Sequence, residues 1–294
     1  MRTTVRALSG DAELLERLTA TQFAATVHSV FDHAANLRLP HDGQLYTVAT
    51  AGIDNAPATL VVDTPTVRTL CLKVGDTVTS HRARLLFPGG RAVDLRSTAA
   101  WRPHLPPLPI PESSRTWLTD FIGREGISGG AKHNVAQDDS WESAVAAQVA
   151  AQLDALIGGL RAGDVSTVSE HAARLVGLGP GLTPTGDDVL LGVLLVAAMP
   201  QSTLAPARRH LARAVDACVA QTTDVSRAAL TQAARGRTRQ RVIGLLDAMA
   251  SGETAAVLDR HGRLVTAIGH TSGTDILVGL SAAMTLESEL RGER

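Results

Sequence analysis

The residues with the clearest chemical potential lie in one glycine-rich stretch, which reads GLGPGLTPTGDDVLLGVLLVAAM from Gly177 to Met199. A loop of glycines and prolines leads directly into an apolar segment, and Thr185 is followed three residues later by Asp188. This spacing is typical of a capping box, in which the two side chains satisfy backbone N–H groups at a helix start. Because such N–H groups lie at the positive end of the helix dipole, the stretch predicts an anion-binding loop.

Asp187 distinguishes this loop from the phosphate-binding loops of nucleoside triphosphatases. The spacing Gly181-x-x-x-x-Gly186 matches theirs, but Asp187 stands where that motif needs a lysine, so a nucleoside triphosphate site is not expected. Capping accounts for Asp188 and leaves the Asp187 carboxylate free to accept from an amide or hydroxyl of a substrate, or to hold a divalent metal ion. No other cofactor is predicted, because the sequence contains neither HExxH nor CxxC spacing.

A second stretch, Gly269 to Gly279, repeats this pattern. Its Ser272-Gly273-Thr274-Asp275 aligns without gaps with Thr185-Gly186-Asp187-Asp188, and an apolar triplet and a glycine, Gly279 or Gly192, follow in each. A glycine inside a helix costs about 1 kcal/mol relative to alanine, so close packing of two helices at these glycines is the expected compensation. Two apolar helices that cross there would bring both loops to a common pocket.

A third polar cluster, Thr222 to Ser226, comes just before a predicted helix. It is either a helix cap at Thr223 or Asp224, or a side of the same pocket. His270 in the second loop suits proton transfer, and a hydrogen bond from its ring to loop backbone is the structural alternative. The candidate catalytic residues are Asp187 and His270. The candidate substrate- or anion-binding residues are Gly177, Gly179, Gly181, Leu182, Thr183, Thr185, Gly186, Asp188, Thr222, Thr223, Ser226, Thr271, Ser272, Gly273 and Asp275.

The elements that must position these loops are helices. From Ser140 onward apolar residues such as Val145, Val149, Leu153 and Leu156 recur at the helical period, on a helix that should end at Gly163. Further helices are predicted over 166–176, 205–220, 224–234, 238–250, 254–259 and 275–290, besides the apolar helix that follows the first loop. The C-terminal part is therefore expected to be all-helical.

The N-terminal part has a different pattern. After a short helix over 11–18, short β-branched segments alternate with turn residues, and Pro88-Gly89-Gly90-Arg91 marks a hairpin. Strands are expected over 26–31, 44–50, 59–62, 69–74, 76–79, 85–87 and 92–95. This spacing predicts a small antiparallel sandwich or barrel, and the fold class of the whole chain is α+β.

A proline-rich segment separates the two parts. Residues 103–111 hold five of the thirteen prolines, which keeps the backbone extended and out of a sheet interior. We expect a β-rich domain over 1–102, a Pro/Gly-rich connection over 103–139 with one short helix near Trp117, and a helical domain over 140–294 that carries both loops. The glycine-rich end of the connection is either a mobile lid that carries Lys132 and His133 or a plain flexible linker.

Composition limits the partners. A net charge of -1 gives no global field for nucleic acid or an anionic membrane, and 3% aromatic residues leave little to stack on bases. The longest apolar run, Val189 to Met199, is too short to span a bilayer, and the N-terminus meets charges too early for a secretory signal. Cys71 and Cys218 suit buried thiols in a reducing compartment. These observations predict a soluble, cytoplasmic protein.

The loops carry a resemblance to a known family. GLGPGLTPTGDDVLLG, together with GHTSGTDILVGL, resembles the signature of the AllH-like family, whose named member is a subunit of oxamate carbamoyltransferase from anaerobic allantoin breakdown. ATVHSVFDHAANLRL, the strand-rich segment ending in AAWRP, and TTDVSRAAL fall in the order that the family shows, so the resemblance covers most of the chain. One departure is that Thr185 and Thr271 stand where the family more often has serine.

The resemblance implies a reaction and partners. A carbamoyl group would pass between carbamoyl phosphate and oxamate, giving oxalurate and phosphate, in allantoin and purine catabolism. The chain would bind a small anionic substrate and work with two other kinds of subunit, with a cationic residue supplied by Arg174 or by a partner. Stabilisation of the departing phosphate by loop N–H groups would be its contribution to this transferase. The alternative functions are a non-catalytic subunit that binds a small carboxylate or phosphate and serves assembly, and a purely structural role for the loops.

Overall fold

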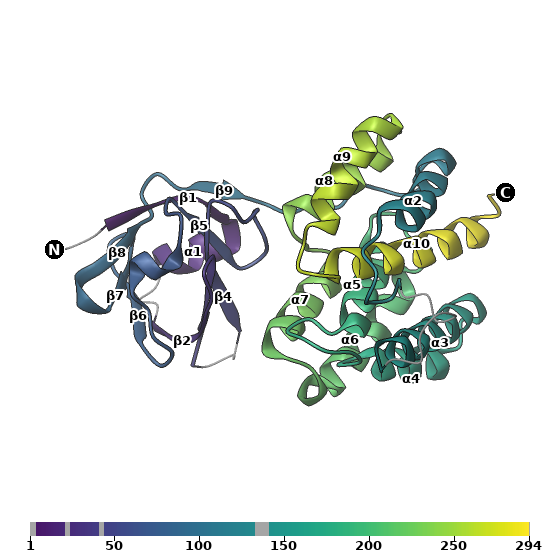
Figure 1. Ribbon diagram of the computed structural model, residues 1–294, viewed down its shortest axis with the longest axis horizontal. Helices are drawn as coiled ribbons and strands as arrows, with labels where there is room; N and C mark the ends of the chain where they lie inside the picture. Colours follow the sequence, from purple (N-terminus) through teal and green to yellow (C-terminus); the bar gives the residue numbers. More distant parts are fainter. Residues whose placement is uncertain (1–3, 21–23, 41–43, 133–140, 294) are drawn as a thin grey trace. The chain divides into compact units, whose positions relative to one another are not determined.

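The structure is a computed structural model that describes residues 4–20, 24–40, 44–132 and 141–293. The chain forms two compact units, residues 1–103 and residues 104–294. Strands make up most of the first unit and helices the second, which confirms the predicted α+β class (Figure 1).

The first unit is a sheet that closes on itself. Its order is β5-β4-β3-β2-β6-β7-β8-β1-β9, and a further pairing of β5 with β1 closes eight strands into a barrel, as predicted, with β9 added beside β1. The strands are β1 (Thr4–Asp11), β2 (Ala24–Val30), β3 (Ala34–Arg38), β4 (Leu45–Thr50), β5 (Thr59–Val62), β6 (Thr77–Ser80), β7 (Arg84–Phe87), β8 (Arg91–Asp94) and β9 (Ala99–Trp101). Every second residue of β1 and β2 is buried over part of its length, and α1 (Ala12–Ala20) packs Leu14 and Leu18 into the same core.

The barrel is mixed, whereas the sequence predicted an antiparallel one. The hairpin β7–β8 at Pro88 to Arg91 is antiparallel as expected, but β4–β5, β1–β8 and β1–β9 are parallel. Turn residues in a sequence predict the pairing only of strands that follow each other along the chain. β1 pairs with Ala92 and Ala99, more than eighty residues after its start, and no local signal marks such a partner.

The strand predicted over 69–74 is wrong. A 3₁₀ helix, Val67–Leu70, stands there, capped by the Thr66 hydroxyl, and the chain leaves it at Cys71 in the left-handed region with φ of 49°. Val67 and Leu70 are buried, so the apolar residues that suggested a strand do reach the core, with helical spacing.

Cys71 is exposed and Cys218 half-buried, which corrects the prediction of two buried thiols.

The second unit is built around one helix. Every residue of α5 (Thr185–Ala198; its place is shown in Figure 1) from Thr185 to Ala197 is buried, as expected for a helix that is apolar on all sides after its first turn. The helices that pack against it are α3 (Trp141–Ala162), α4 (Val165–Leu175), α6 (Arg208–Ala217), α7 (Asp224–Ala234) and α10 (Ser272–Arg291). A further group, α2 (Glu112–Glu125), α8 (Gln240–Ala250) and α9 (Ala255–Thr266), packs together, and α2 and α9 contact α10. The helix predicted to end at Gly163 does so, with φ of 67° at that glycine.

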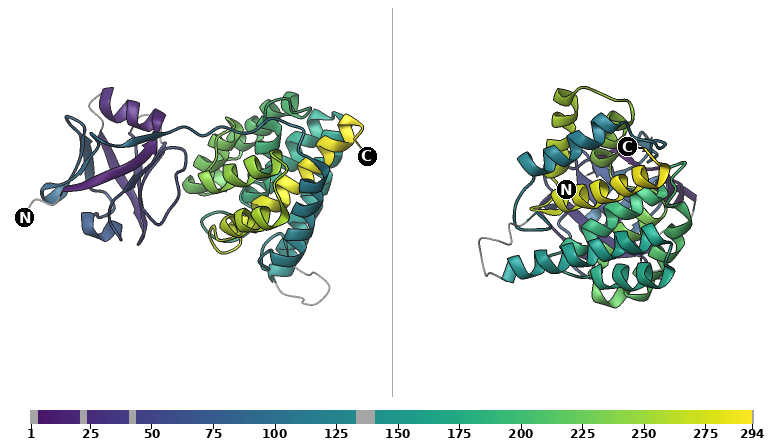
Figure 2. Two further views of the ribbon diagram at one scale, coloured as in Figure 1. Left: turned by 90° about the horizontal axis from the view of Figure 1, so that it is seen from above. Right: turned by 90° about the vertical axis from the view of Figure 1, so that its right-hand side faces the viewer.

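The stretch expected to connect the parts contributes to the second unit. α2 is longer than the short helix predicted near Trp117, and it packs against α9 and α10 (Figure 2). Trp117 and Phe121 are buried on it with ring centroids 4.9 Å apart. Gly262 makes room for Phe121, because a Cβ there would lie 2.6 Å from the Phe121 ring.

One described helix, α3, is long and apolar enough to cross a membrane by length and composition alone. Its buried residues include Val149, Leu153, Leu156 and Leu160. These residues form the face predicted from the helical period, and α3 packs against α4 and α10.

Candidate functional site

The crossing of α5 and α10 positions the two glycine-rich loops. A Cβ at Gly192 would lie 2.4 Å from the Ile276 carbonyl oxygen, and one at Gly279 would lie 2.0 Å from that of Val189. The helices therefore touch backbone to backbone at these glycines, as predicted. Their N-terminal ends meet as well, because the Thr183 and Ser272 hydroxyls are 2.7 Å apart across the two loops.

The two loops also resemble each other in the way their glycines pack. Gly186 fits against the last turn of α4, where a Cβ would lie 2.2 Å from the Leu175 carbonyl oxygen. Gly273 fits in the same way against α9, with 1.9 Å to the Val265 carbonyl oxygen. Each glycine thus lets a helix start directly against the helix that precedes it.

The first loop needs glycine for two reasons. Gly177, Gly179 and Gly181 have φ of 75°, 115° and 96°, in the region that side chains disfavour. Gly177 is also packed, since a Cβ would lie 2.0 Å from the Gln221 carbonyl oxygen, while Gly181 faces open space. The backbone conformation, rather than contact, therefore selects glycine at Gly181.

Both loops present backbone donors that the protein does not use. Among the described residues, no acceptor is bonded to the N–H groups of Gly179, Gly181, Leu182 and Thr183, or to those of His270, Thr271 and Ser272. Pro180 to Leu182 and Gly269 to His270 are exposed. N–H groups in this position, at two helix N-termini, favour an anion.

Asp187 is not free, and that part of the prediction is wrong. It is fully buried, and its Oδ1 accepts from the Gly177 backbone N–H at 2.8 Å. Its Oδ2 accepts from the hydroxyls of Thr222 and Ser226, the latter at 2.7 Å. The carboxylate therefore holds the start of the loop against the segment before α7.

The cluster over Thr222 to Ser226 is both a cap and a neighbour of the loop. Thr223 caps α7 by accepting from the Ser226 backbone N–H at 3.0 Å, and its hydroxyl donates to the Leu182 carbonyl oxygen at 2.5 Å. The predicted helix cap is thus confirmed, and the same threonine also binds the first loop.

The capping box predicted for Asp188 and Asp275 is absent. The N-caps are Pro184 and Thr271, one residue earlier than predicted, and neither makes a side-chain cap hydrogen bond. Asp188 is 4% exposed and Asp275 is fully buried, and the Oδ2 of each has no hydrogen-bond partner. The Oδ1 of Asp275 accepts from the Ala131 backbone N–H at 2.7 Å.

Burial raises the pKa of both carboxyls. For Asp188 the loss of water raises the pKa well above its usual range, the nearby Asp275 raises it further, and the Ser272 and Thr183 hydroxyls oppose the rise. For Asp275 burial raises the pKa to about 6, against the Ala131 N–H and the Thr271 and Thr185 hydroxyls, which favour the ionised form. The pKa of Asp188 on α5 is thus lowered by Ser272, the first residue of α10, and the pKa of Asp275 on α10 by Thr185, the first residue of α5.

The segment after α2 covers the start of α10, which the sequence did not predict. The Ile127 N–H donates to the Thr274 hydroxyl at 2.9 Å, and Gly130 lies so close to Asp275 that a Cβ would be 2.3 Å from its Oδ1. Lys132 donates to the carbonyl oxygens of Gly123 and Gly126, at 2.8 Å each, where it terminates α2. Gly129-Gly130 was the sequence signal for this close approach. His133 lies outside the described residues.

His270 and Arg174 lie on the surface. His270 is exposed in the second loop, and no hydrogen bond from its ring to loop backbone occurs among the described residues. Arg174 is exposed and forms an ion pair with Glu170 at 2.7 Å, one turn earlier on α4. The described part of the chain also has no group of three or more His, Cys, Asp or Glu side chains placed to hold a metal ion.

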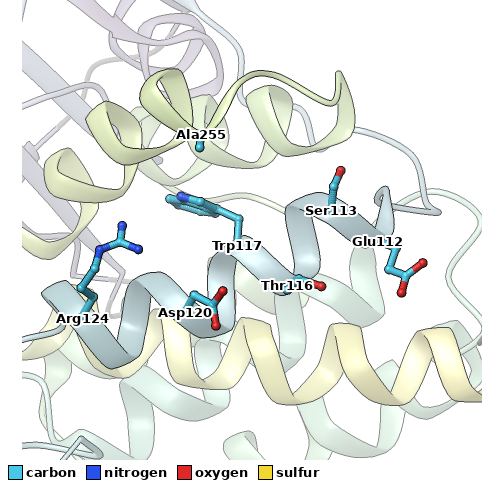
Figure 3. A pocket seen from close by; sticks show the side chains of 7 residues that line it. All are labelled: Glu112, Ser113, Thr116, Trp117, Asp120, Arg124 and Ala255. Carbon is cyan, nitrogen blue, oxygen red and sulfur yellow. The ribbon is translucent and has the colours of Figure 1, made fainter.

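An open hollow of about 590 Å³ lies elsewhere, between α2 and α9 (Figure 3). It is lined by Glu112, Ser113, Thr116, Trp117, Asp120, Arg124 and Ala255. The Trp117 indole N–H and the Arg124 guanidinium both donate to Asp259, at 2.9 and 3.0 Å. None of the residues predicted from the sequence lines it.

Two family models match this chain. Residues 175–284, from the end of α4 into α10, match the family model described as oxamate carbamoyltransferase subunit AllH. Residues 6–100, the barrel, match the model of the AllH family N-terminal domain. No solved structure matches this chain. The two matches cover most of both units, and the chain belongs to the AllH family.

Proposed function

We propose that this chain binds a small anionic substrate at its paired loops, as a subunit of a carbamoyltransferase of the oxamate carbamoyltransferase type. The observation that carries the proposal is the pair of unbonded N–H sets on Gly179 to Thr183 and His270 to Ser272, which meet at the Thr183–Ser272 contact. Two helix N-termini that converge on one exposed surface are suited to a phosphate or a carboxylate.

The reaction would join carbamoyl phosphate and oxamate. The oxamate amide nitrogen attacks the carbamoyl carbon, the bond to the phosphate oxygen breaks, the nitrogen loses a proton, and oxalurate and phosphate are formed. N–H groups aimed at the departing phosphate stabilise the charge that develops on it, without a covalent intermediate. The exposed His270 is the candidate for the proton transfer, and Asp187 acts by fixing the loop rather than by touching substrate.

A partner subunit is expected to complete the site. Phosphate sites commonly include a cationic side chain, and Arg174 is paired with Glu170. Leu182, at the tip of the first loop, is 52% exposed beside the unbonded N–H groups, where a second chain would cover it. The same exposed leucine supports the second candidate, a non-catalytic anion-binding or assembly subunit. Both candidates fit a cytoplasmic, heteromeric complex of allantoin catabolism, without nucleic acid or membrane.

Calorimetry with phosphate and with oxamate measures anion binding at the proposed site. The variant that tests the first loop most directly is Gly181→Ala. Alanine at φ of 96° strains the loop without a clash, because nothing lies within 4 Å of the added Cβ. Gly163→Ala is the matched control, with φ of 67°, equally open surroundings and a position at the end of α3. We expect Gly181→Ala to weaken anion binding about tenfold or more and Gly163→Ala to leave it unchanged.

Turnover separates the two candidates. We expect the chain to convert carbamoyl phosphate and oxamate only with its co-purified partners, and Gly181→Ala to reduce that turnover. If the complex with Gly181→Ala turns over as fast as the wild-type complex, although the variant has lost anion binding, the loop is not catalytic. That result would favour the non-catalytic anion-binding or assembly subunit.

A further inference from the structure

Asp188 and Asp275 are buried carboxylates whose hydrogen-bonding capacity the protein leaves unfilled. Asp188 is 4% exposed, Asp275 is fully buried, and the Oδ2 of each lacks a donor. We propose that these two residues bind a divalent cation of the hard, oxygen-preferring class, Mg²⁺ or Mn²⁺, between the N-termini of α5 and α10. This site goes beyond the proposed anion site and does not depend on it.

Among the carboxyl groups of the described residues, Asp188 and Asp275 differ from the neighbouring Asp187 in having a buried oxygen without a partner. Asp187 is equally buried, yet three donors from Gly177, Thr222 and Ser226 satisfy it. Leaving a buried acceptor without a donor costs about 1–3 kcal/mol, and more for a charged group. The fold satisfies Asp187, whereas the Oδ2 atoms of Asp188 and Asp275 have no hydrogen-bond partner. We infer that these two oxygens are available to a ligand.

The surrounding groups identify the class of ligand. The Thr183 and Ser272 hydroxyls hydrogen-bond to the carboxyl group of Asp188, and the Thr185 and Thr271 hydroxyls to that of Asp275, although the Oδ2 of each stays without a partner. Oxygen donors of this kind, without sulfur or imidazole, suit Mg²⁺, Mn²⁺ or Ca²⁺. Mg²⁺ in particular is commonly held by one or two carboxylates, with water or a substrate phosphate as further ligands. The proposed site is of the two-carboxylate kind, since the described residues contain no group of three or more His, Cys, Asp or Glu side chains placed to hold a metal ion.

Charge and space favour an ion over an organic ligand. Across the described residues, neither carboxylate has an ion pair with a Lys, Arg or His side chain. The two helix N-termini contribute roughly half a positive charge each, less than two carboxylates require. The bare oxygens are closed to solvent, and Gly130 and Ala131 cover Asp275. A position closed to solvent suits a single ion better than an amide substrate, which needs an open cavity.

Mn²⁺ is the probe, because electron paramagnetic resonance counts the free ion directly. The full chain is titrated with Mn²⁺ in phosphate-free buffer, and Mg²⁺ is then added as a competitor. We expect one Mn²⁺ per chain, displaced by Mg²⁺, and binding about tenfold to a hundredfold weaker in both Asp188→Asn and Asp275→Asn. Asp154→Asn is the matched control, since Asp154 is exposed on α3 and its change in charge is the same. Circular dichroism confirms that each variant is folded.

Ser272→Ala is the second variant, because it removes only a neighbouring hydroxyl and keeps both carboxylates. We expect weaker Mn²⁺ binding in this variant too, with a smaller change than in the Asn variants. Stoichiometric binding that Asp188→Asn and Asp275→Asn leave intact would place the ion elsewhere and overturn the proposal. A wild-type chain that binds neither Mn²⁺ nor Mg²⁺ would overturn it as well, and would assign the bare oxygens to a proton or a water molecule.

Discussion

At the scale of single residues, Asp187 and Asp188 are adjacent carboxylates with opposite surroundings. Three hydrogen bonds satisfy Asp187, whereas Asp188 has a bare oxygen and the nearby charge of Asp275. The first carboxylate therefore stabilises the fold. The second leaves a buried carboxyl oxygen without a hydrogen bond, which lowers stability.

Substitution by asparagine should separate these two roles. In Asp187→Asn an amide replaces an oxygen that accepts a hydrogen bond, so the free energy of unfolding should fall by about 1–3 kcal/mol. In Asp188→Asn a carboxyl group whose charged form is disfavoured by burial is replaced by a neutral amide of the same shape, so stability should stay equal or rise. Urea denaturation with a chelator present measures both. Equal losses in the two variants would contradict this assignment.

The raised pKa of Asp275 predicts how stability depends on pH. With a folded-state pKa of about 6, above the usual 3.8, the folded state holds the proton more tightly than the unfolded state. The contribution to stability is therefore complete below about pH 4 and is lost as the pH rises through 6. A shift of about two units corresponds to about 3 kcal/mol at most.

Asp275→Asn keeps the side chain neutral and should remove this dependence. Urea denaturation with a chelator present measures the unfolding free energies of wild type and variant at pH 4.5 and pH 7.5. We expect the variant to be the more stable protein, by a larger margin at pH 7.5 than at pH 4.5. A constant difference would show that Asp275 titrates normally.

At the scale of elements, the crossing of α5 and α10 is what brings the loops together. Gly279→Ala would place a methyl group 2.0 Å from the Val189 carbonyl oxygen, a contact with backbone that no rotamer change relieves. We expect a loss of about 1–3 kcal/mol or more in unfolding free energy, as for overpacked cores, together with weaker anion binding.

Gly158→Ala is the control for this substitution. Gly158 is also inside a helix, α3, but a Cβ there meets nothing within 4 Å. The variant should gain about 0.5–1 kcal/mol from helix propensity and bind anions as the wild type does. Similar stabilities for Gly158→Ala and Gly279→Ala would mean that the two helices can separate without cost.

The same elements show what the sequence could predict. The crossing at Gly192 and Gly279 was predictable, because a glycine inside an apolar helix costs stability unless another helix packs closely against it. The roles of Asp187 and Asp188 were not, since they depend on whether the N-cap is Thr185 or Pro184, and on Thr222 and Ser226, which are distant in sequence. The parallel pairing of β1 with β8 and β9 was missed for the same reason, because pairing partners far along the chain leave no local pattern. The strands β1, β3 and β9 were not predicted either, although β3 pairs with β2 and β4, its neighbours along the chain.

At the scale of the whole molecule, the proline-rich segment belongs to the helical unit rather than to a linker. Leu105, Leu108 and Ile110 are buried, and the Leu108 N–H donates to the Pro200 carbonyl oxygen at 3.0 Å. The unit therefore starts at 104, where the chain divides, and not at 140 as the sequence suggested. Extended backbone with alternate buried side chains packs against helices without forming a helix or a strand itself.

Two truncations test this boundary. A chain of residues 104–294 keeps the three apolar side chains and should fold cooperatively and bind phosphate at its loops. A chain of residues 112–294 loses them, and burial of each contributes about 1.5–3 kcal/mol as an upper estimate. Because domains are stable by only about 5–15 kcal/mol, the shorter chain should be strongly destabilised or only partly folded. Circular dichroism and urea denaturation compare the two, and equal stability would show that residues 104–111 do connect the units without supporting either.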